Sequence, residues 1–588
     1  MSLQVDDPQS AALKLFELGL FAEAEQAYQA LLTRQRGNAD AWNMLGISLL
    51  RQQKYAQSVE ALEMAVEVAP RSPQALNNLG NVYKEGNEPA KAARYYRRAL
   101  ALSADFVMAH ANLASCLVEL GELEQAEQHA RLAIVLNPQS FEAWSALACA
   151  AERRADYAGA IEVLKSALEI FPDQADWLLH MGSTHILAKQ HDAAIDVLKR
   201  ALRSRPQFVE AMSNLGKALF EAGRLEEAEA ILQEAIQLRP SMCPLHVNLA
   251  NVYVAMKQHV AAQACFQEVF KLDPENASAH FVYGMVLLVE GDFDQGWSEY
   301  NYRWQIDTYK EGLKRLHAPQ WCGEDLHDKT LLVHAEQGVG DSLHFCRYLA
   351  QLQTCGARVI FECQPAIKRL MSSIHGCDVL VAKGDALPDY EMHVPLLNIP
   401  AVLGTRLETI PAHVPYLQVD AEAKQNWVSR LEKLGLARKV GIVWAGNPVH
   451  ANDHNRSMQL AQLGPLASVH GIRWISLQKG GKADALSEHA LFDLVDWTAE
   501  LADFYDTAAL VEALDLVITV DTSVAHLAGA LNKPVWVMVP FAPDWRWLLD
   551  RTDSPWYPSM RLFRQTLRGD WSGVIADVAQ ALNVLTKY

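Results

Sequence analysis

A 34-residue repeat runs through the first half of the chain and restricts the folds open to it. Small residues recur at this interval, without a slip, in a first column: Ala24, Ser58, Ala92, Ala126, Ala160, Ala194, Ala228, Ala262 and Gly296. A second column keeps the same interval: Ala12, Gly46, Gly80, Ala114, Ala148, Gly182, Gly216, Ala250 and Gly284. Proline closes most units: Pro70, Pro138, Pro172, Pro206, Pro240 and Pro274. Small side chains allow paired helices to approach closely and proline ends a helix, so the pattern predicts a stack of helix pairs.

This period is that of the tetratricopeptide repeat (TPR), a unit of two antiparallel helices. We expect eight complete units up to about residue 276 and a ninth, aromatic-rich helix pair over about 277–306. Such units stack into a superhelix whose concave face suits an extended protein segment. Residues 1–306 are therefore predicted to be a protein-binding superhelix, and any chemistry is expected after about residue 315.

Asparagine occupies a further column, two positions before the second column of small residues. Its members are Asn78, Asn112, Asn214 and Asn248. An amide side chain both donates and accepts hydrogen bonds, so a row of them can pair with the backbone of a bound peptide. The alternative is that asparagine at this position belongs to the repeat itself, and the sequence leaves both interpretations open.

Composition excludes several classes of protein. The net charge of -18 over 588 residues argues against general binding to nucleic acid or to an anionic membrane. The nine cysteines form no CxxC pair, and none lies in a motif with a paired histidine, which favours reduced thiols in the cytoplasm without a catalytic role. We expect no signal peptide, because the start MSLQVDDPQSAAL lacks basic and apolar regions, and no membrane span.

The second half has a different pattern. Residues 307–328 show no clear period and are predicted to be a linker. Strand-like runs then alternate with helical ones over 329–436, and the pattern restarts over 437–588 after a helical, proline-marked stretch. Strands that alternate with helices imply a parallel sheet. The chain is therefore predicted to be an α-solenoid followed by two Rossmann-like α/β halves that face a cleft.

One predicted site loop follows the first strand, in the run EQGVGD. Gly338 and Gly340 are expected to form a tight turn beside Gln337, and Asp341 to open the next helix. Asp341 is either a helix N-cap or a base that takes the proton of an acceptor hydroxyl. Glu336 is its nearest competitor as a base.

A second loop contains Asp521, Thr522 and Ser523, which end a strand where a helix begins at once. Backbone N–H groups at a helix N-terminus bind anions, so this segment suits the diphosphate of a nucleotide-sugar. The alternative is a well-capped helix with no ligand.

A third loop, residues 444–457, follows the strand that opens the second half. It contains Gly446 and Asn447, and its Arg456 is expected to clamp phosphate. His450, Asp453 and His454 are ligand types, but Pro448 and the Asn and Gly content predict a loop without helical convergence, so we expect no metal. The later tryptophans and tyrosine of residues 541–564 either stack a base or sugar or anchor the domains.

These segments together resemble the ADP-heptose:lipopolysaccharide heptosyltransferase family, which has the GT-B fold. The resemblance covers about residues 329–565 and is most specific in DTSVAHLAGALNKPVWVMVP. It implies that Asp341 is catalytic and that Arg456 contacts phosphate, where the family often has lysine. It also implies that a donor-binding segment contains Asp521, Thr522 and His526, with Ser523 in place of the usual glycine.

The first α/β half is shorter than the acceptor domain of that family, so acceptor recognition is expected to lie in the TPR half. The layout also resembles protein O-GlcNAc transferase and the TPR-fused glycosyltransferases that modify flagellin. We therefore expect a cytoplasmic glycosyltransferase that needs no cofactor and moves a sugar from a nucleotide-sugar to a protein hydroxyl, with flagellin one candidate acceptor. The alternatives are a glycan or lipopolysaccharide glycosyltransferase with TPR docking, or a non-catalytic scaffold.

Overall fold

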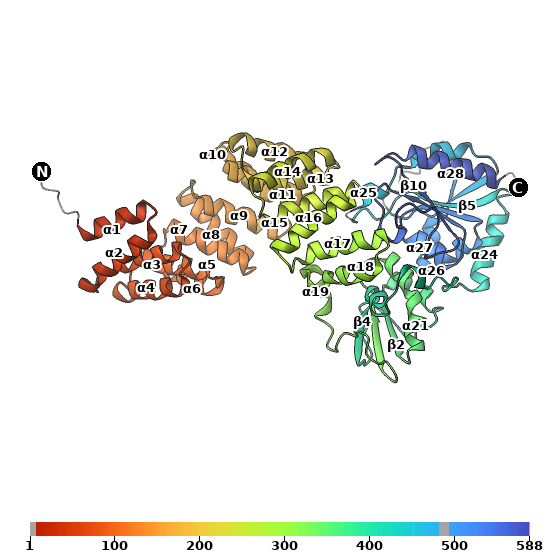
Figure 1. The fold of residues 1–588 in the computed structure, drawn as a ribbon, viewed down its shortest axis with the longest axis horizontal. Coiled ribbons are helices and arrows are strands. Elements are labelled where there is room, and N and C mark those ends of the chain that lie inside the picture. The colour runs from red at the N-terminus through yellow and green to blue at the C-terminus, as the bar shows by residue number, and fades with distance from the viewer. Residues whose placement is uncertain (1–6, 451, 481–492, 587–588) are drawn as a thin grey trace. The chain divides into compact units, whose positions relative to one another are not determined.

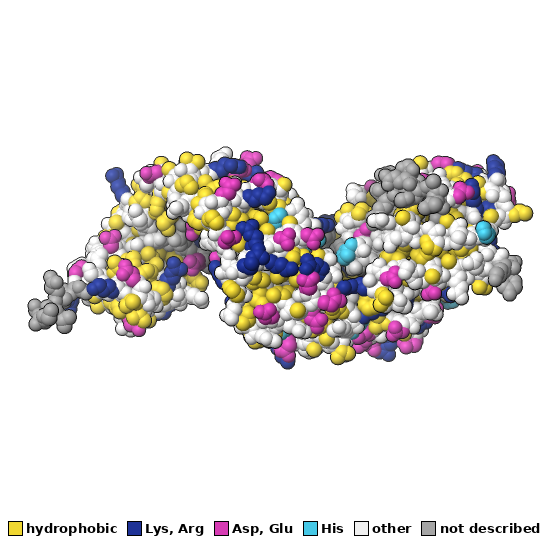
Figure 2. All heavy atoms as spheres, turned by 90° about the horizontal axis from the view of Figure 1, so that it is seen from above, with side chains coloured by type: hydrophobic (Ala, Val, Ile, Leu, Met, Phe, Trp, Pro, Cys, Tyr) yellow, Lys and Arg dark blue, Asp and Glu magenta, His cyan; other side chains and the backbone are white. Residues whose placement is uncertain are grey.

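A computed structural model describes residues 7–450, 452–480 and 493–586. Its backbone contacts divide the chain into two compact units, Met1–Asn248 and Leu249–Tyr588. Among the described residues, no helix combines the length and the apolar character needed to cross a membrane. On the face drawn in Figure 2, acidic side chains accompany basic ones over much of the surface.

The first unit is a series of antiparallel helix pairs that follow the 34-residue period (Figure 1). Its helices are α1 (Pro8–Glu17), α2 (Phe21–Arg34), α3 (Ala39–Arg51), α4 (Tyr55–Val68), α5 (Pro73–Glu85), α6 (Pro89–Leu102), α7 (Val107–Glu119), α8 (Leu123–Leu136), α9 (Phe141–Arg153), α10 (Tyr157–Ile170), α11 (Ala175–Leu187), α12 (His191–Ser204), α13 (Val209–Glu221) and α14 (Leu225–Leu238). Helix α15 (Cys243–Ala255) spans the division between the units. The repeat predicted from the sequence is confirmed, and the helices of one unit recur 34 residues after those of the last.

The columns of small residues mark where paired helices touch. A Cβ atom added at Gly182 would lie 2.5 Å from Cγ of Leu198, and one added at Gly216 would lie 2.5 Å from Cγ of Leu232. Ser58 fills such a position with a polar side chain because its Oγ donates to the carbonyl oxygen of Gly46, at 2.7 Å. The close approach of paired helices therefore explains why small residues recur every 34 positions.

The second unit begins with the last helix pairs. These are α16 (His259–Leu272), α17 (Ala277–Glu290) and α18 (Phe293–Tyr300), followed by the 3-10 helix η1 (Asn301–Gln305) and by α19 (Asp307–Leu313). Side chains of α17 and α18 share one hydrophobic core with the α/β part, where Trp297 packs edge-on against Trp545 at 5.3 Å between ring centres. The aromatic ninth pair thus covers the open end of the repeat array, as terminal repeats must.

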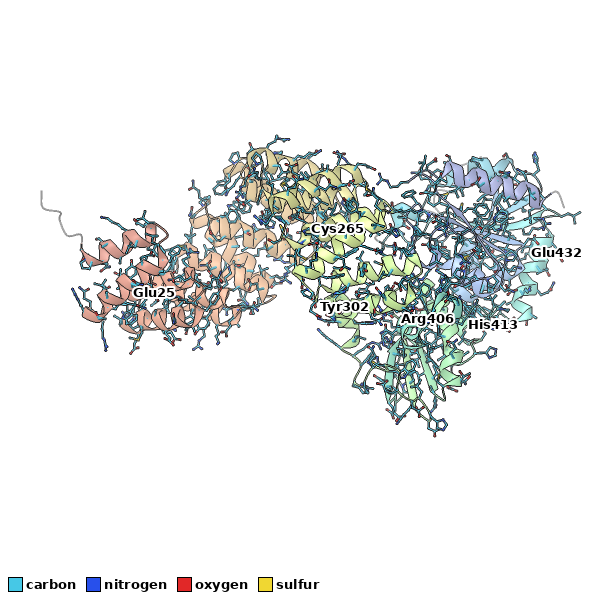
Figure 3. The ribbon with its side chains drawn as sticks, in the orientation of Figure 1. Glu25, Cys265, Tyr302, Arg406, His413 and Glu432 are labelled. Atoms are coloured by element: carbon cyan, nitrogen blue, oxygen red, sulfur yellow. The ribbon has the colours of Figure 1, made fainter. Side chains whose placement is uncertain are left out.

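Polar contacts join the same segments. Trp297 Nε1 donates to the carbonyl oxygen of Thr405 at 2.9 Å. Arg406, labelled in Figure 3, forms an exposed ion pair with Asp294 of α18 at 2.8 Å. The segment 307–328 contains α19, and Gln320 pairs in parallel with His393 at a sheet edge.

The first sheet has four parallel strands in the order β3-β2-β1-β4. Its elements are β1 (Thr330–His334), α20 (Val339–Phe345), α21 (Leu349–Thr354), β2 (Arg358–Cys363), α22 (Lys368–Met371), β3 (Val379–Ala382), β4 (Met392–Pro395) and α23 (Ile399–Val402). Strand β4 was not predicted from the sequence, because its four residues end in proline and give too short an apolar run. Because β4 pairs with β1, the carboxyl end of β1 lies between β2 and β4.

The second sheet has six parallel strands in the order β10-β9-β8-β5-β6-β7. Its elements are α24 (Ala421–Glu432), β5 (Arg438–Val443), α25 (Asp453–Arg456), β6 (Ile472–Ser476), β7 (Leu494–Asp496), α26 (Phe504–Ala513), β8 (Leu516–Val520), α27 (Ser523–Ala530), β9 (Val535–Val539), β10 (Met560–Arg564) and α28 (Ser572–Leu585). Helix α28 covers one face and α26 and α27 the other (Figure 1). Strand β10 pairs in parallel with β9 and extends the sheet beyond it.

Candidate active site

Two of the predicted site loops meet at one point of the six-stranded sheet. When its strands are numbered in chain order starting from β5, this sheet has the strand order of a doubly wound α/β fold. The direction in which successive strands are added reverses between β5 and β8. Ligands of such sheets bind beyond the carboxyl ends of the strands at this reversal. The loop with Gly446 and Asn447 follows β5, and Asp521 follows β8, so the fold places both segments where a ligand is expected.

Arg456 lies at the end of α25, one helical turn inside a segment expected to be a loop. Its side chain is 15 % exposed, and its Nε lies 3.6 Å from Oδ1 of Asp453. That Nε is buried and has no hydrogen-bond acceptor among the described residues. A Cβ atom at Gly446 would meet Nη2 of Arg456 at 2.7 Å, so a side chain there would displace the guanidinium from this position.

Asp521 is the most perturbed carboxyl group of this region. Burial, together with the negative charge of Asp544, raises its pKa to about 6, and the positive charges of Arg456 and Arg546 oppose the rise. A carboxyl group that titrates near neutrality can exchange a proton during a reaction, which makes Asp521 a candidate acid or base as well as a donor contact.

Asp341 is fixed by two partners. Its Oδ2 accepts from the N–H of Gly338 at 2.8 Å, and its Oδ1 lies 2.5 Å from Nη2 of Arg546. It is the third residue of α20, and Gly338 is the N-cap, so the interpretation of Asp341 as the N-cap itself was wrong. The tight turn depends on Gln337, whose φ of 49° is the left-handed value, and Gln337 Nε2 donates to the hydroxyl of Tyr300 at 3.0 Å.

Gly340 brings the first sheet against the second. A Cβ atom there would lie 3.3 Å from Cδ2 of His526 and 3.4 Å from Cα of Ser523. The loop after β1 therefore touches the first turn of α27, and a side chain at Gly340 would be in tight contact with it.

His526 and Thr522 already have protein partners. The hydroxyl of Thr522 accepts from the N–H of Val524 at 3.3 Å and so caps α27. Buried His526 lies 3.1 Å from the hydroxyl of Tyr557 and 3.2 Å from Nδ1 of His344, and burial holds its pKa well below the ordinary value. Asn447 Oδ1 accepts from the N–H of Val449 at 3.1 Å in its own loop. These contacts support the loops, whereas the buried Nε of Arg456 has no acceptor among the described residues.

Sequence reasoning did not predict the contacts that connect the two sheets. Arg546, from the aromatic segment after β9, binds Asp341 and also Asp544, at 2.9 Å. We call Asp341, Asp521, Asp544, Arg456 and Arg546 the charged cluster. The link between Asp341 and Arg546 spans 205 residues, and the only signal in the sequence was a basic residue within a tryptophan-rich run.

Glu336, the competing base, is held by contacts within the first sheet and η1. Its carboxylate lies 2.8 Å from Nη2 of fully buried Arg303 and accepts from the N–H of Leu397 at 3.1 Å. Burial raises its pKa, and Arg303 opposes the rise. Glu336 therefore holds the helical segment η1 against the first sheet.

The aromatic residues after β9 are buried, which favours their role as anchors. Trp547 stacks on His526 with 5.2 Å between ring centres, and Trp545 packs among the aromatic rings of α18. The buried side chains of this group are Trp545, Trp547, Trp556 and Tyr557.

The asparagine column in the first unit forms hydrogen bonds between neighbouring repeats. Asn112 Nδ2 donates to Oδ1 of Asn81 at 3.0 Å and to Oδ1 of Asn77 at 3.1 Å. Asn214 Nδ2 donates to Oγ of Ser183 at 2.8 Å. Equivalent bonds tie Asn78 to Asn43 and Asn248 to Ser213. The asparagine side chains thus link neighbouring repeats. Fewer of their amide donors remain for a bound peptide than the sequence suggests.

Comparison with known proteins identifies the repeats. Profiles described as "Tetratricopeptide repeat" match residues 37–105, 77–141, 117–175, 153–216, 185–241 and 219–280. "Protein FlbA" of Caulobacter vibrioides is 24% identical over 595 residues, which is 97% of this chain and 88% of that protein. The "Probable UDP-N-acetylglucosamine--peptide N-acetylglucosaminyltransferase SPINDLY" of Hordeum vulgare is 32% identical over 101 residues, or 17% of this chain and 11% of that one. A crystal structure of a tetratricopeptide repeat protein from Parabacteroides merdae matches with a TM-score of 0.37 and 16% identity over 42% of this chain and 97% of that one.

Proposed function

We propose that the chain is a glycosyltransferase that moves a sugar from a nucleotide-sugar to a protein hydroxyl, and that its TPR units recruit the acceptor protein. The observation that carries the proposal is the charged cluster, in which residues of both parallel sheets meet at the strand-order reversal of the larger one. The peptide-modifying relative named above and the relative of matching length support it. Under this proposal the two sheets form a GT-B arrangement with the nucleotide-sugar on the second.

The donor diphosphate lies against Arg456 and the first turn of α27. The buried Nε of Arg456 then gains an acceptor, and the positive end of the helix dipole faces the phosphates. As the bond between sugar and diphosphate breaks, negative charge grows on the departing diphosphate, and the guanidinium stabilises it.

Proton removal from the acceptor hydroxyl is the second task. Asp341 lies on the loop that meets α27, and its oxygens keep lone pairs beyond those used by Gly338 and Arg546. Asp521 is the alternative base, because its pKa of about 6 leaves it ionised at neutral pH. The proton moves from the hydroxyl to the carboxylate while the hydroxyl oxygen attacks the anomeric carbon.

Transfer to protein is tested by incubating the purified chain with candidate acceptors and a panel of nucleotide-sugars, ADP-heptose first because of the family resemblance. Intact-protein mass spectrometry should show an added sugar mass on one acceptor, mapped to a serine or threonine. Sugar found on a glycan or lipid acceptor, with none on protein under the same conditions, would contradict the proposed acceptor class.

A further inference from the structure

The asparagine column of the first unit is interrupted in the middle of the array. Two members of the 34-residue series, positions 146 and 180, are alanine and histidine. In two repeats of the column, the asparagine contacts a polar side chain 31 residues earlier: Asn112 contacts Asn81, and Asn214 contacts Ser183. The residue 31 positions before His180 is Cys149, so the repeat places a thiol against an imidazole.

Cys149, Glu152 and His180 form a compact group of three ligand types. The thiol sulfur, one carboxylate oxygen and one ring nitrogen all lie within 4.8 Å of one another. His180 Nε2 lies 3.3 Å from Oε1 of Glu152, and the two side chains are 20 % and 17 % exposed. The group bridges α9 and α11, and solvent reaches it although it is mostly enclosed.

A fourth residue orients the carboxylate. Thr184 Oγ1 lies 2.6 Å from Oε1 of Glu152 and donates to it. Within the described ranges, the only ion-pair partner of Glu152 is His180, so no lysine or arginine permanently neutralises the carboxylate. A cation bound here would therefore meet a carboxylate whose ion-pair partner is an imidazole and not a fixed positive charge.

The chemistry of the three ligands selects the ion. Sulfur, imidazole nitrogen and carboxylate oxygen together suit Zn²⁺, whereas Mg²⁺ and Ca²⁺ prefer oxygen alone. Zinc bond lengths of about 2.0–2.3 Å place tetrahedral ligand atoms roughly 3–4 Å apart, so the side chains need to close by only about 1 Å.

We propose that Cys149, Glu152 and His180 bind one Zn²⁺ ion, with Thr184 positioning the carboxylate and the fourth coordination position left to water or to a group from a bound partner. Cys149 binds as the thiolate and releases its proton to solvent. The site uses residues of the first unit only, so it stands or falls independently of the proposed transferase activity.

The test uses the full chain, freed of metal by a chelator and titrated with Co²⁺. Cysteine ligation should give a cysteinate-to-cobalt charge-transfer band that saturates at one ion per chain and disappears when Zn²⁺ is added. Cys149→Ser should abolish the band, and His180→Gln should weaken Zn²⁺ binding, measured against a chromophoric chelator, by more than 100-fold. Thr184→Val should weaken it by about 10–100-fold, the usual effect of losing a residue that orients a ligand.

Matched controls separate a site from general thiol or histidine binding. His191→Gln removes a histidine 3.3 Å from Glu221, a similar pair without a cysteine, and Cys355→Ser removes an exposed thiol. Both should leave the band and the affinity unchanged. Circular dichroism establishes that each variant is folded. Absence of the band in the wild type, or equal zinc affinity in wild type, folded Cys149→Ser and folded His180→Gln, would overturn the proposal.

Discussion

Replacement of Asp521 by asparagine should stabilise the folded chain at neutral pH. Burial and Asp544 raise the pKa of Asp521 from its ordinary value of 3.8 to about 6. The folded state then binds more protons than the unfolded state between these two values, so stability falls as pH rises through this window. At 1.36 kcal/mol for each pH unit, the ionised side chain costs up to about 3 kcal/mol above pH 6.

The variant has no carboxylate to ionise and avoids this cost. Its advantage in the free energy of unfolding should be about 3 kcal/mol at pH 7 and about 1 kcal/mol at pH 4.5, from the same linkage relation. Urea titrations followed by tryptophan fluorescence at several pH values measure the difference. Asp570→Asn is the control of opposite sign, because hydrogen bonds from Ser572 lower the pKa of Asp570. An advantage for Asp521→Asn that stays constant or shrinks as pH rises would refute the reasoning.

Three further variants test the site and its support. Asp341→Asn should lower sugar transfer by about 10²–10⁴-fold with unchanged donor affinity if the residue is the base, and near-normal turnover of the folded variant would leave it a capping residue. Gly446→Ala should weaken nucleotide binding at least tenfold in calorimetry, because the added methyl group displaces the guanidinium of Arg456. Gly464→Ala should leave binding unchanged, because a Cβ atom there meets no atom within 4 Å. Arg303→Met should lower the free energy of unfolding by about 3–5 kcal/mol in denaturant titrations, because it leaves the buried carboxylate of Glu336 without its ion-pair partner. The exposed Arg406→Met should lower it by at most about 1 kcal/mol, and equal losses would refute that account.

The helical repeat could be predicted from the sequence because each small residue in it has a packing reason. Gly182 and Gly216 are spaced by the period and each lies against a leucine of the paired helix. The loops after β1, β5 and β8 were also predictable, since each follows an apolar strand run and carries glycine or polar residues.

Contacts between distant segments could not be predicted in this way. Arg546 reaches Asp341 only because the segment after β9 folds back over α20, and no local pattern encodes that path. Strand β10 was missed because Arg561 and Arg564 interrupt its apolar run. The pairing of Cys149 with His180 was missed although the period contains it, because cysteine was assessed by sequence motifs and not by its place in the repeat.

The release of free nucleotide from nucleotide-sugars tests the central claim most directly. The purified full-length chain is incubated with UDP-, ADP-, GDP- and CMP-linked sugars, and nucleotide release is followed by chromatography beside the folded Arg456→Ala variant. The account predicts that the wild type releases nucleotide from one donor class, and that Arg456→Ala loses this release together with donor affinity. Equal donor affinity and equal release by the wild type and Arg456→Ala, or no release from any donor in the presence of acceptor protein, would contradict it.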